Sequence, residues 1–119
     1  MVAGPVRPLG TVGRVSVAVA LEDLPGEVGR WGFGYLLTSS DDGRPHAVAL
    51  IPVVADGVLR FEAGGRTCRN AAARPGVSIV FPPVADDGFS LVVDGDATVD
   101  GDSVVVTPTS AVRHRPAPR

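Results

Sequence analysis

The chain has 119 residues, of which 45% are apolar and only 5% aromatic. This predicts one domain spanning residues 1–119, with a core built mainly of Val, Ala, Leu and Ile. The net charge of −2 disfavours nucleic acid as a partner, because phosphate binding needs a basic surface. No apolar run reaches the roughly 20 residues of a membrane-spanning helix, and the one cysteine cannot form an intrachain disulfide. We therefore expect a cytoplasmic protein without a membrane partner.

The first half of the chain predicts a short helix followed by strands. Residues 1–12, rich in Gly and Pro, read as a tail. Residues 21–30 predict a short helix interrupted by Pro25 and Gly26. Three apolar runs follow, closed by turns at Asp41-Asp42-Gly43 and Asp56-Gly57, which indicate hairpins: residues 33–38, 47–55 and 58–63. The third strand should pair with the second.

The second half repeats this pattern of short strands. Residues 66–74 predict a second short helix, ended by Pro75-Gly76. Strands are expected at residues 77–81, 89–93 and 99–107, with a bulge at Asp94-Gly95-Asp96 and a hairpin turn at Asp100-Gly101-Asp102. Residues 108–119 read as a closing tail. The whole pattern predicts a mainly β fold, a six-stranded antiparallel split β-barrel with two short helices.

Two of these strands scarcely alternate between apolar and polar residues, which bears on assembly. The runs at residues 47–51 and 77–81 are apolar nearly throughout, so both of their faces should be covered. One face fills the barrel, and the other needs a partner.

A candidate anion site lies where the third strand meets the second helix, at Gly64-Gly65-Arg66-Thr67-Cys68-Arg69-Asn70. The first N–H groups of a helix have no partner within the helix and attract anions. Arginines at this end oppose the helix dipole unless an anion is bound. Thr67 can either cap the helix or donate its hydroxyl to that anion. The alternative is a plain glycine turn followed by solvated arginines.

The order of these motifs resembles a known family. A strand is followed by Asp42-Gly43-Arg44-Pro45-His46, a long apolar strand, a hairpin strand through Phe61, the helix start at Arg66, and Arg74-Pro75-Gly76-Val77 before the next strand. From residue 33 to residue 99 this resembles the pyridoxamine 5'-phosphate oxidase-like, FMN-binding split-barrel proteins, which include deazaflavin-dependent reductases. The resemblance implies an FMN-dependent oxidoreductase that acts on a small molecule, with the cofactor at the seam of a homodimer.

The resemblance also implies which residues bind the cofactor. The long strand would line the flavin through Leu50, Ile51, Pro52 and Val53, and the helix start would bind its phosphate through Arg66, Thr67 and Arg69. The chain departs from true pyridoxamine phosphate oxidases, which carry Arg and Lys where Val48 and Val53 stand here. Two alternatives therefore stay open. One is a deazaflavin-dependent reductase, and the other is a dimer that binds flavin or serves as a scaffold without catalysis.

The remaining candidate residues are isolated. The acidic tail of a deazaflavin coenzyme would need basic partners, and the arginines available for it are Arg113, Arg115 and Arg119. Cys68 reads as a buried thiol, or else as a nucleophile paired with His46. The two histidines and one cysteine make no metal-ligand pattern, so no metal is expected. We expect no catalytic acid or base among the side chains.

Overall fold

The computed structural model describes residues 15–84 and 88–117, so the predicted tail at residues 1–12 lies outside the described part. The sheet is built from these strands: β1 (Ser16–Ala18), β2 (Gly34–Ser39), β3 (Pro45–Leu50), β4 (Val53–Ala55), β5 (Val58–Glu62), β6 (Gly76–Phe81), β7 (Ser90–Asp100) and β8 (Ser103–His114). The helical elements are a short 3-10 helix η2 (Leu21–Asp23), α1 (Leu24–Val28) and α2 (Gly65–Ala73).

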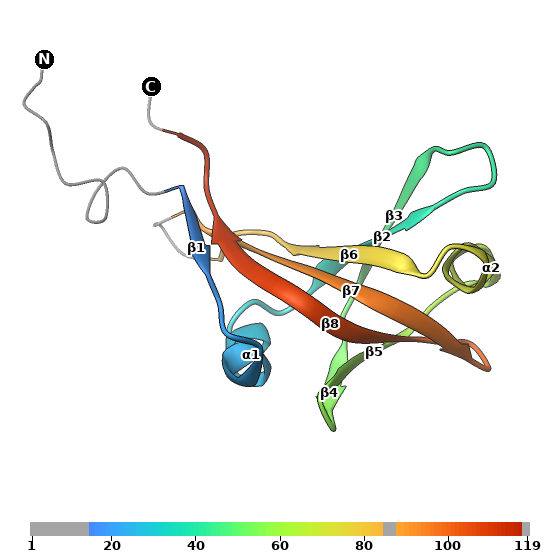
Figure 1. Cartoon of the computed structure of the whole chain (residues 1–119), viewed down its shortest axis with the longest axis horizontal. Coiled ribbons are helices and arrows are strands. Elements are labelled where there is room, and N and C mark those ends of the chain that lie inside the picture. Colours follow the sequence, from blue (N-terminus) through green and yellow to red (C-terminus); the bar gives the residue numbers. More distant parts are fainter. Residues whose placement is uncertain (1–14, 85–87, 118–119) are drawn as a thin grey trace, which may run out of the picture.

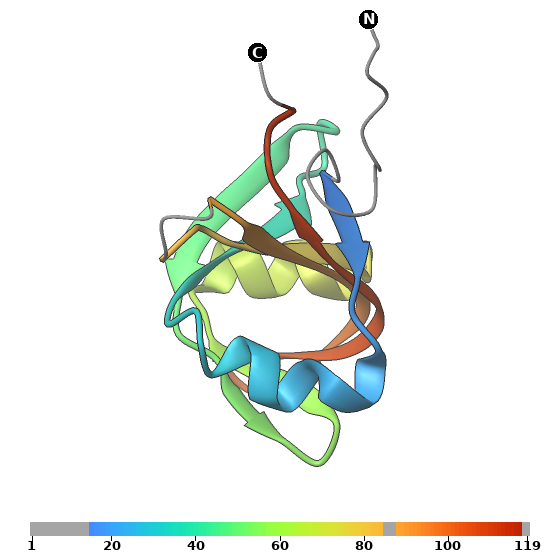
Figure 2. The same ribbon diagram turned by 90° about the vertical axis from the view of Figure 1, so that its left-hand side faces the viewer.

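The strands form one antiparallel sheet in the order β3-β2-β6-β7-β8-β5-β4, with β1 pairing with β8. The sheet curls, and the β2–β3 and β4–β5 hairpins project from it in opposite directions (Figure 1). Figure 1 shows α1 below β1 and α2 at the opposite end of the molecule, and the turned view of Figure 2 looks along the molecule with both helices crossing the view. The prediction of a mainly β antiparallel split barrel with two short helices is confirmed. None of the helices in the described part of the chain is long and apolar enough to cross a membrane.

The predicted number of six strands is wrong for two reasons. The run at residues 47–55 divides into β3 and β4 around Pro52, which has no N–H for a sheet hydrogen bond. The short strand β1 was not expected. The predicted pairing of β5 with the strand before it is confirmed. Its turn has positive φ at both Asp56 (54°) and Gly57 (78°), as a tight hairpin turn requires.

The prediction of a tail at residues 108–119 is also wrong, because β8 continues to His114. Proline is disfavoured inside a central strand, so Pro108 in the sequence predicts that the last strand ends before it. In the structure Pro108 lies opposite Gly95, where the register of β7 and β8 shifts, and such a bulge is a place where a sheet accepts Pro. The expected bulge at residues 94–96 is therefore confirmed, and it is what allows β8 to extend.

The core fills the inner side of the curled sheet. Its largest fully buried side chains come from every part of the barrel: Phe61, Phe81, Leu24, Leu36, Leu59, Ile79 and Leu91. Helix α2 packs against β2, β7 and β8, contributing the buried residues Cys68 and Ala71. Trp31 is also buried, and its indole N–H donates to the backbone oxygen of Phe89 at 3.3 Å. This core fixes where α2 begins, which is where the candidate site lies.

A substitution at Gly95 tests the role of the bulge between β7 and β8. A Cβ at this position would lie 2.6 Å from the backbone oxygen of Thr107 and 2.6 Å from Cγ1 of Val106, so Gly95→Ala forces the two longest strands apart. We expect the free energy of unfolding to fall by about 1–3 kcal/mol, as for other overpacked sites, in urea titrations. Gly76→Ala is the control, because nothing lies within 4 Å of its Cβ position. Equal stabilities of the two variants would contradict this account.

Candidate functional site

Helix α2 begins without a side-chain cap. Its N-cap residue is Gly64, in an extended conformation, and the first hydrogen bond along the helix joins the N–H of Cys68 to the oxygen of Gly64 at 3.0 Å. The N–H groups of Gly65, Arg66 and Thr67 therefore precede the helical hydrogen-bonding pattern. They form the positive end of the helix dipole.

Two arginine side chains, Arg66 and Arg69, lie at this end of α2. Both are exposed and line a pocket of about 340 Å³ together with residues of the β2–β3 turn and Asn70. Nη1 of Arg69 lies 3.2 Å from the position that a Cβ would take on Gly65, so its guanidinium group folds back over the first turn. Neither arginine forms an ion pair or side-chain hydrogen bond with any residue of 15–84 or 88–117.

Two carboxylates line the same pocket, but other arginines hold both of them. Nη2 of Arg74 contacts Oδ1 of Asp41 at 2.6 Å. Asp42 lies 3.7 Å from Nε of Arg44 and accepts a hydrogen bond from the backbone N–H of Arg44 at 3.0 Å. The charges of Arg66 and Arg69 therefore remain available to a ligand.

The position of α2 is set by contacts that the sequence did not reveal. Nδ2 of Asn70 donates to the hydroxyl of Thr38 at 3.2 Å, and both side chains are buried. Nε of Arg74 donates to the backbone oxygen of Ser39 at 2.8 Å. Residues 38 and 70 are far apart in the chain, and only their polar character inside apolar surroundings could have indicated that they pair.

The predicted strand residues lie at the other end of the β2–β3 hairpin. Leu50 packs against the core, Pro52 is half-buried, and the side chains of Ile51 and Val53 are 74% and 64% exposed. A depression of about 580 Å³ opens here, lined by Phe33, Tyr35, Ala49, Leu50, Ile51 and Glu62. The sequence did not predict that Phe33, Tyr35 and Glu62 line this depression, since Phe33 and Tyr35 flank the first residue of β2 and Glu62 lies at the end of β5.

The predicted site residues therefore fall into two places along one hairpin. Tyr35, in the depression, and Ser40, in the arginine pocket, are five residues apart, about 17 Å of strand. Thr67 is different, because the whole residue is only 2% exposed. The interpretation of Thr67 as the helix cap is wrong, since Gly64 holds that position.

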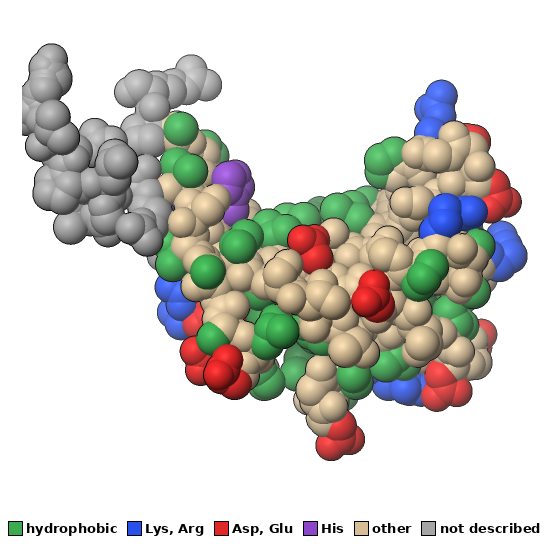
Figure 3. Space-filling model, in the orientation of Figure 1, with side chains coloured by type: hydrophobic (Ala, Val, Ile, Leu, Met, Phe, Trp, Pro, Cys, Tyr) green, Lys and Arg blue, Asp and Glu red, His purple; other side chains and the backbone are tan. Residues whose placement is uncertain are grey.

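The outer face of the sheet is apolar over much of its width. Side chains directly opposite one another across five strands form one row: Ala49, Tyr35, Val80, Val92 and Val112. The next row begins with the apolar residues Ala47 and Leu37 and ends in polar ones, Ser78, Asp94 and Ser110. The hydroxyls of Ser78 and Ser110 donate to the Asp94 carboxylate at 2.6 and 3.3 Å. Figure 3 shows hydrophobic side chains along a broad concavity between the two raised ends of the molecule.

Comparison with known proteins identifies relatives of this chain. No family model matches the sequence. The protein Mb0449c of Mycobacterium bovis is 38% identical over 118 residues, covering 85% of this chain and 78% of the relative, and MT0457 of Mycobacterium tuberculosis gives the same values. Both are named as uncharacterized proteins. The chain belongs to the family of these two mycobacterial proteins.

Solved structures show how widely the fold is shared. An F420 reductase matches with a TM-score of 0.55 and 23% identity, over 68% of this chain and 89% of its own. The FAD-binding protein of Mycobacterium smegmatis matches with a TM-score of 0.62 and 21% identity, over 84% and 99%. A Listeria innocua protein, whose name refers to pyridoxamine 5'-phosphate oxidase, has a TM-score of 0.60 and 14% identity, over 79% and 96%. The fold is thus the split barrel of the pyridoxamine 5'-phosphate oxidase-like proteins, as the sequence resemblance implied.

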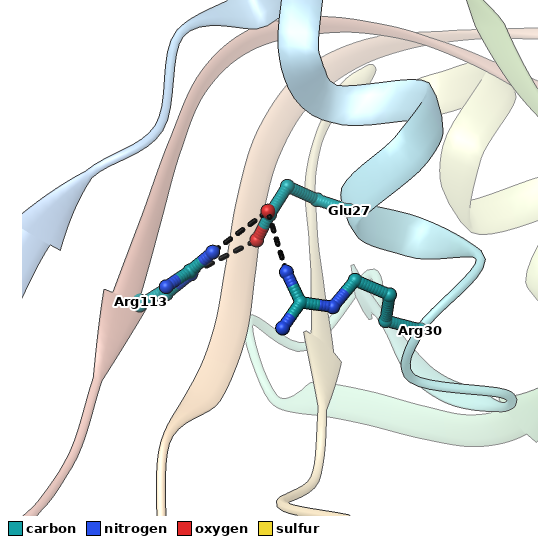
Figure 4. A network of polar contacts seen from close by, with 3 residues as sticks. All are labelled: Glu27, Arg30 and Arg113. Atoms are coloured by element: carbon teal, nitrogen blue, oxygen red, sulfur yellow. Dashed lines mark hydrogen bonds and ion pairs between the residues drawn. The ribbon is translucent and has the colours of Figure 1, made fainter.

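Within this split-barrel fold, Arg113 is not the spare donor that the sequence suggested. It donates from Nε and Nη2 to the two carboxylate oxygens of Glu27, at 2.9 and 2.7 Å, and Arg30 contacts the same carboxylate at 3.3 Å (Figure 4). The guanidinium of Arg115 lies 4.7 Å from the ring centroid of Phe89. Arg119 lies outside the described residues. Arg113 therefore serves to fasten β8 to α1.

Cys68 is buried, as the simpler interpretation held. Burial raises the pKa of its thiol, and the charges of Asp102 and Glu62 raise it further. At neutral pH the group is therefore a protonated thiol, not a thiolate nucleophile. No group of three metal-ligating side chains comes together within residues 15–84 and 88–117.

The Glu27 network predicts a sensitivity to acid. The hydrogen bond from Arg113 lowers the pKa of Glu27 below its ordinary value of 4.5, outweighing the effect of burial. A carboxyl with a lowered pKa stabilises the folded state above its ordinary pKa, and this stabilisation is lost as the pH falls through the lowered value. We expect Glu27→Gln to reduce the free energy of unfolding by about 1–2 kcal/mol at pH 7. The difference from the wild type should shrink in denaturant titrations below pH 4.5, and a constant difference would contradict the assignment.

Proposed function

We propose that this protein is a homodimeric flavin-dependent oxidoreductase that binds FMN, with the phosphate at the start of α2 and the ring along residues 50–53. One observation carries the proposal. In the described part of the chain, every other arginine has a partner: Arg30 and Arg113 bind Glu27, Arg44 binds Asp42, Arg60 binds Asp100, Arg74 binds Asp41, and Arg115 lies over Phe89. Among the arginines of residues 15–84 and 88–117, only Arg66 and Arg69 are without one, and they stand at the positive end of a helix.

The chemistry of the donors fits a phosphate. Guanidinium groups bind phosphate oxygens through paired, charge-assisted hydrogen bonds, and the N–H groups of the exposed residues Gly65 and Arg66 add further donors. Without an anion, two cations at this end of the helix are unfavourable by a few tenths of a kcal/mol each. A bound phosphate makes the placement of these two cations favourable, because its negative charge attracts both of them.

The spacing fits an elongated ligand with one charged and one apolar end. The arginine pocket and the depression beside Ile51 lie about 17 Å apart along the β2–β3 hairpin, so a compact anion would contact only the first. A flavin nucleotide has a flat ring and an anionic tail, and the exposed side chains of Ile51 and Val53 offer the ring an apolar surface. Proteins of the same fold that are named for FAD or F420 support this class of cofactor.

The flavin, when bound, supplies hydride transfer. The protein residues bind and orient it and keep water from its ring. The depression is open to solvent in the single chain, so a second copy is needed to close it. The row from Ala49 to Val112 gives this copy an apolar surface on which to pack.

A deazaflavin coenzyme is the second candidate, and the likeness to an F420 reductase favours it. Its acidic tail requires basic residues beyond the phosphate site. Since Arg113 is held by Glu27, this tail would have to use Arg66, Arg69 or the exposed Arg44. Spectra of the purified protein titrated separately with FMN and with the deazaflavin coenzyme distinguish the two.

Arg66→Ala tests the phosphate site. Loss of a charge-assisted contact should weaken FMN binding by about 1.5–3 kcal/mol, roughly a tenfold to hundredfold rise in Kd, measured by quenching of flavin fluorescence. Arg30→Ala is the matched control, because Arg30 is an exposed arginine that contacts Glu27 and does not line the arginine pocket. Unchanged affinity in Arg66→Ala would exclude Arg66 from the site, and no uptake of either coenzyme by the wild type would overturn the proposal.

Val80→Asp tests the dimer. Val80 lies in the middle of the outer apolar row, where a buried carboxylate without a partner would be strongly unfavourable. We expect the variant to elute from a sizing column as a monomer, while the wild type elutes as a dimer. Ala55→Asp is the control, since Ala55 is exposed next to the β4–β5 turn and should leave the dimer intact. A monomeric wild type would refute the assembly.

A further inference from the structure

The depression beside Ile51 has the composition of a site for a flat, cationic ligand. Phe33 and Tyr35 are each 41% exposed, and their ring centroids are 5.4 Å apart in an edge-to-face arrangement. Such rings accept a further aromatic ring, and their faces attract cations. Among the described residues that line the same depression, only Glu62 carries a charge.

The charge of Glu62 is held in place and is not neutralised. Its carboxylate accepts a hydrogen bond from the hydroxyl of Ser103, which is buried in β8. Arg60, two residues earlier on the same strand, contacts Asp100 at 2.6 Å. Glu62 forms no ion pair with any residue that the structure describes.

The Cys68 thiol on the neighbouring helix shows the sign of the electrostatic field in this region. Burial raises the pKa of the Cys68 thiol on α2, and the charges of Asp102 and Glu62 raise it further, which means that these two charges disfavour another negative charge there. The backbone oxygen of Asp102 also accepts the N–H of Ala63, which follows Glu62. The end of β5 is therefore an acidic region next to two exposed aromatic rings.

We infer that the substrate of this site is a flat aromatic compound that is cationic or uncharged, and that Glu62 selects against anionic substrates. This inference rests on the proposed function, in which the flavin ring lies along Ile51 and a second copy covers the open side. Exclusion of water by that copy strengthens the attraction of Glu62 for a cation, because Coulomb energies grow as the effective dielectric constant falls. The two ends of the hairpin thus have opposite preferences, since Arg66 and Arg69 attract anions.

Three probes that share one ring and differ in charge test the inference: benzylamine, which is protonated at pH 7, benzyl alcohol and benzoate. Their dissociation constants are measured by ligand-observed NMR on the protein with and without FMN. The wild type should bind benzylamine about tenfold more tightly than benzoate, the size of a modest Coulomb difference, with benzyl alcohol in between. Glu62→Gln should bring the three constants within about twofold, because Gln keeps an acceptor for Ser103 and loses the charge.

Glu22→Gln is the control, because Glu22 is an exposed carboxylate that lines a different pocket, between η2 and the β4–β5 hairpin. It should retain the tenfold preference. The inference is overturned if Glu62→Gln keeps the preference, if the wild type binds benzoate at least as tightly as benzylamine, or if no probe binds. Failure of FMN to bind would contradict the proposed function alone, since the titrations without FMN still test Glu62. Normal FMN binding without a charge preference would contradict this inference alone.

Discussion

A buried hydrogen bond from the side-chain amide of Asn70 to the hydroxyl of Thr38 joins helix α2 to strand β2, and the candidate site depends on it. Both groups lie where water cannot replace a lost partner, so a change in the position of α2 would leave two buried polar groups unsatisfied. The contact from Arg74 to the backbone of Ser39 fixes the other end of the helix. Together they hold the start of α2 beside the β2–β3 turn, where Arg66 and Arg69 meet Ser40 and its neighbours.

The rest of the charge distribution follows a simple division. Arginines that fasten elements together are paired with carboxylates, as Arg113 is with Glu27 between β8 and α1 and Arg60 is with Asp100 between β5 and the end of β7. The arginines at the start of α2 fasten nothing within the described residues, and they stand where the helix dipole is already positive. At the opposite end of the hairpin, Glu62 stands beside exposed aromatic rings. An elongated ligand can meet both environments at once.

The sequence predicted features that depend on local signals. Asp56-Gly57 and Asp100-Gly101-Asp102 mark tight turns because few other residues adopt their backbone angles, and Gly95 marks the bulge. The extension of β8 beyond Pro108 could not be predicted, because it depends on the bulge in the neighbouring strand. The same holds for the Arg113–Glu27 pair and for the meeting of Tyr35 with Glu62, which follow from the curl of the sheet. Arg66 and Arg69 could be identified as candidates, but their lack of carboxylate partners is a property of the folded chain.

The central claim is that two unpaired arginines at the start of α2 bind the anionic end of a flavin in a cleft completed by a second copy of the chain. A crystal structure of the protein with FMN tests it most directly. The account predicts the phosphate within hydrogen-bonding distance of the Arg66 guanidinium group and the first N–H groups of α2, with the ring against Ile51 and beneath a second protomer. A phosphate bound elsewhere, or a single protomer whose Arg66 and Arg69 point into open solvent, would contradict it.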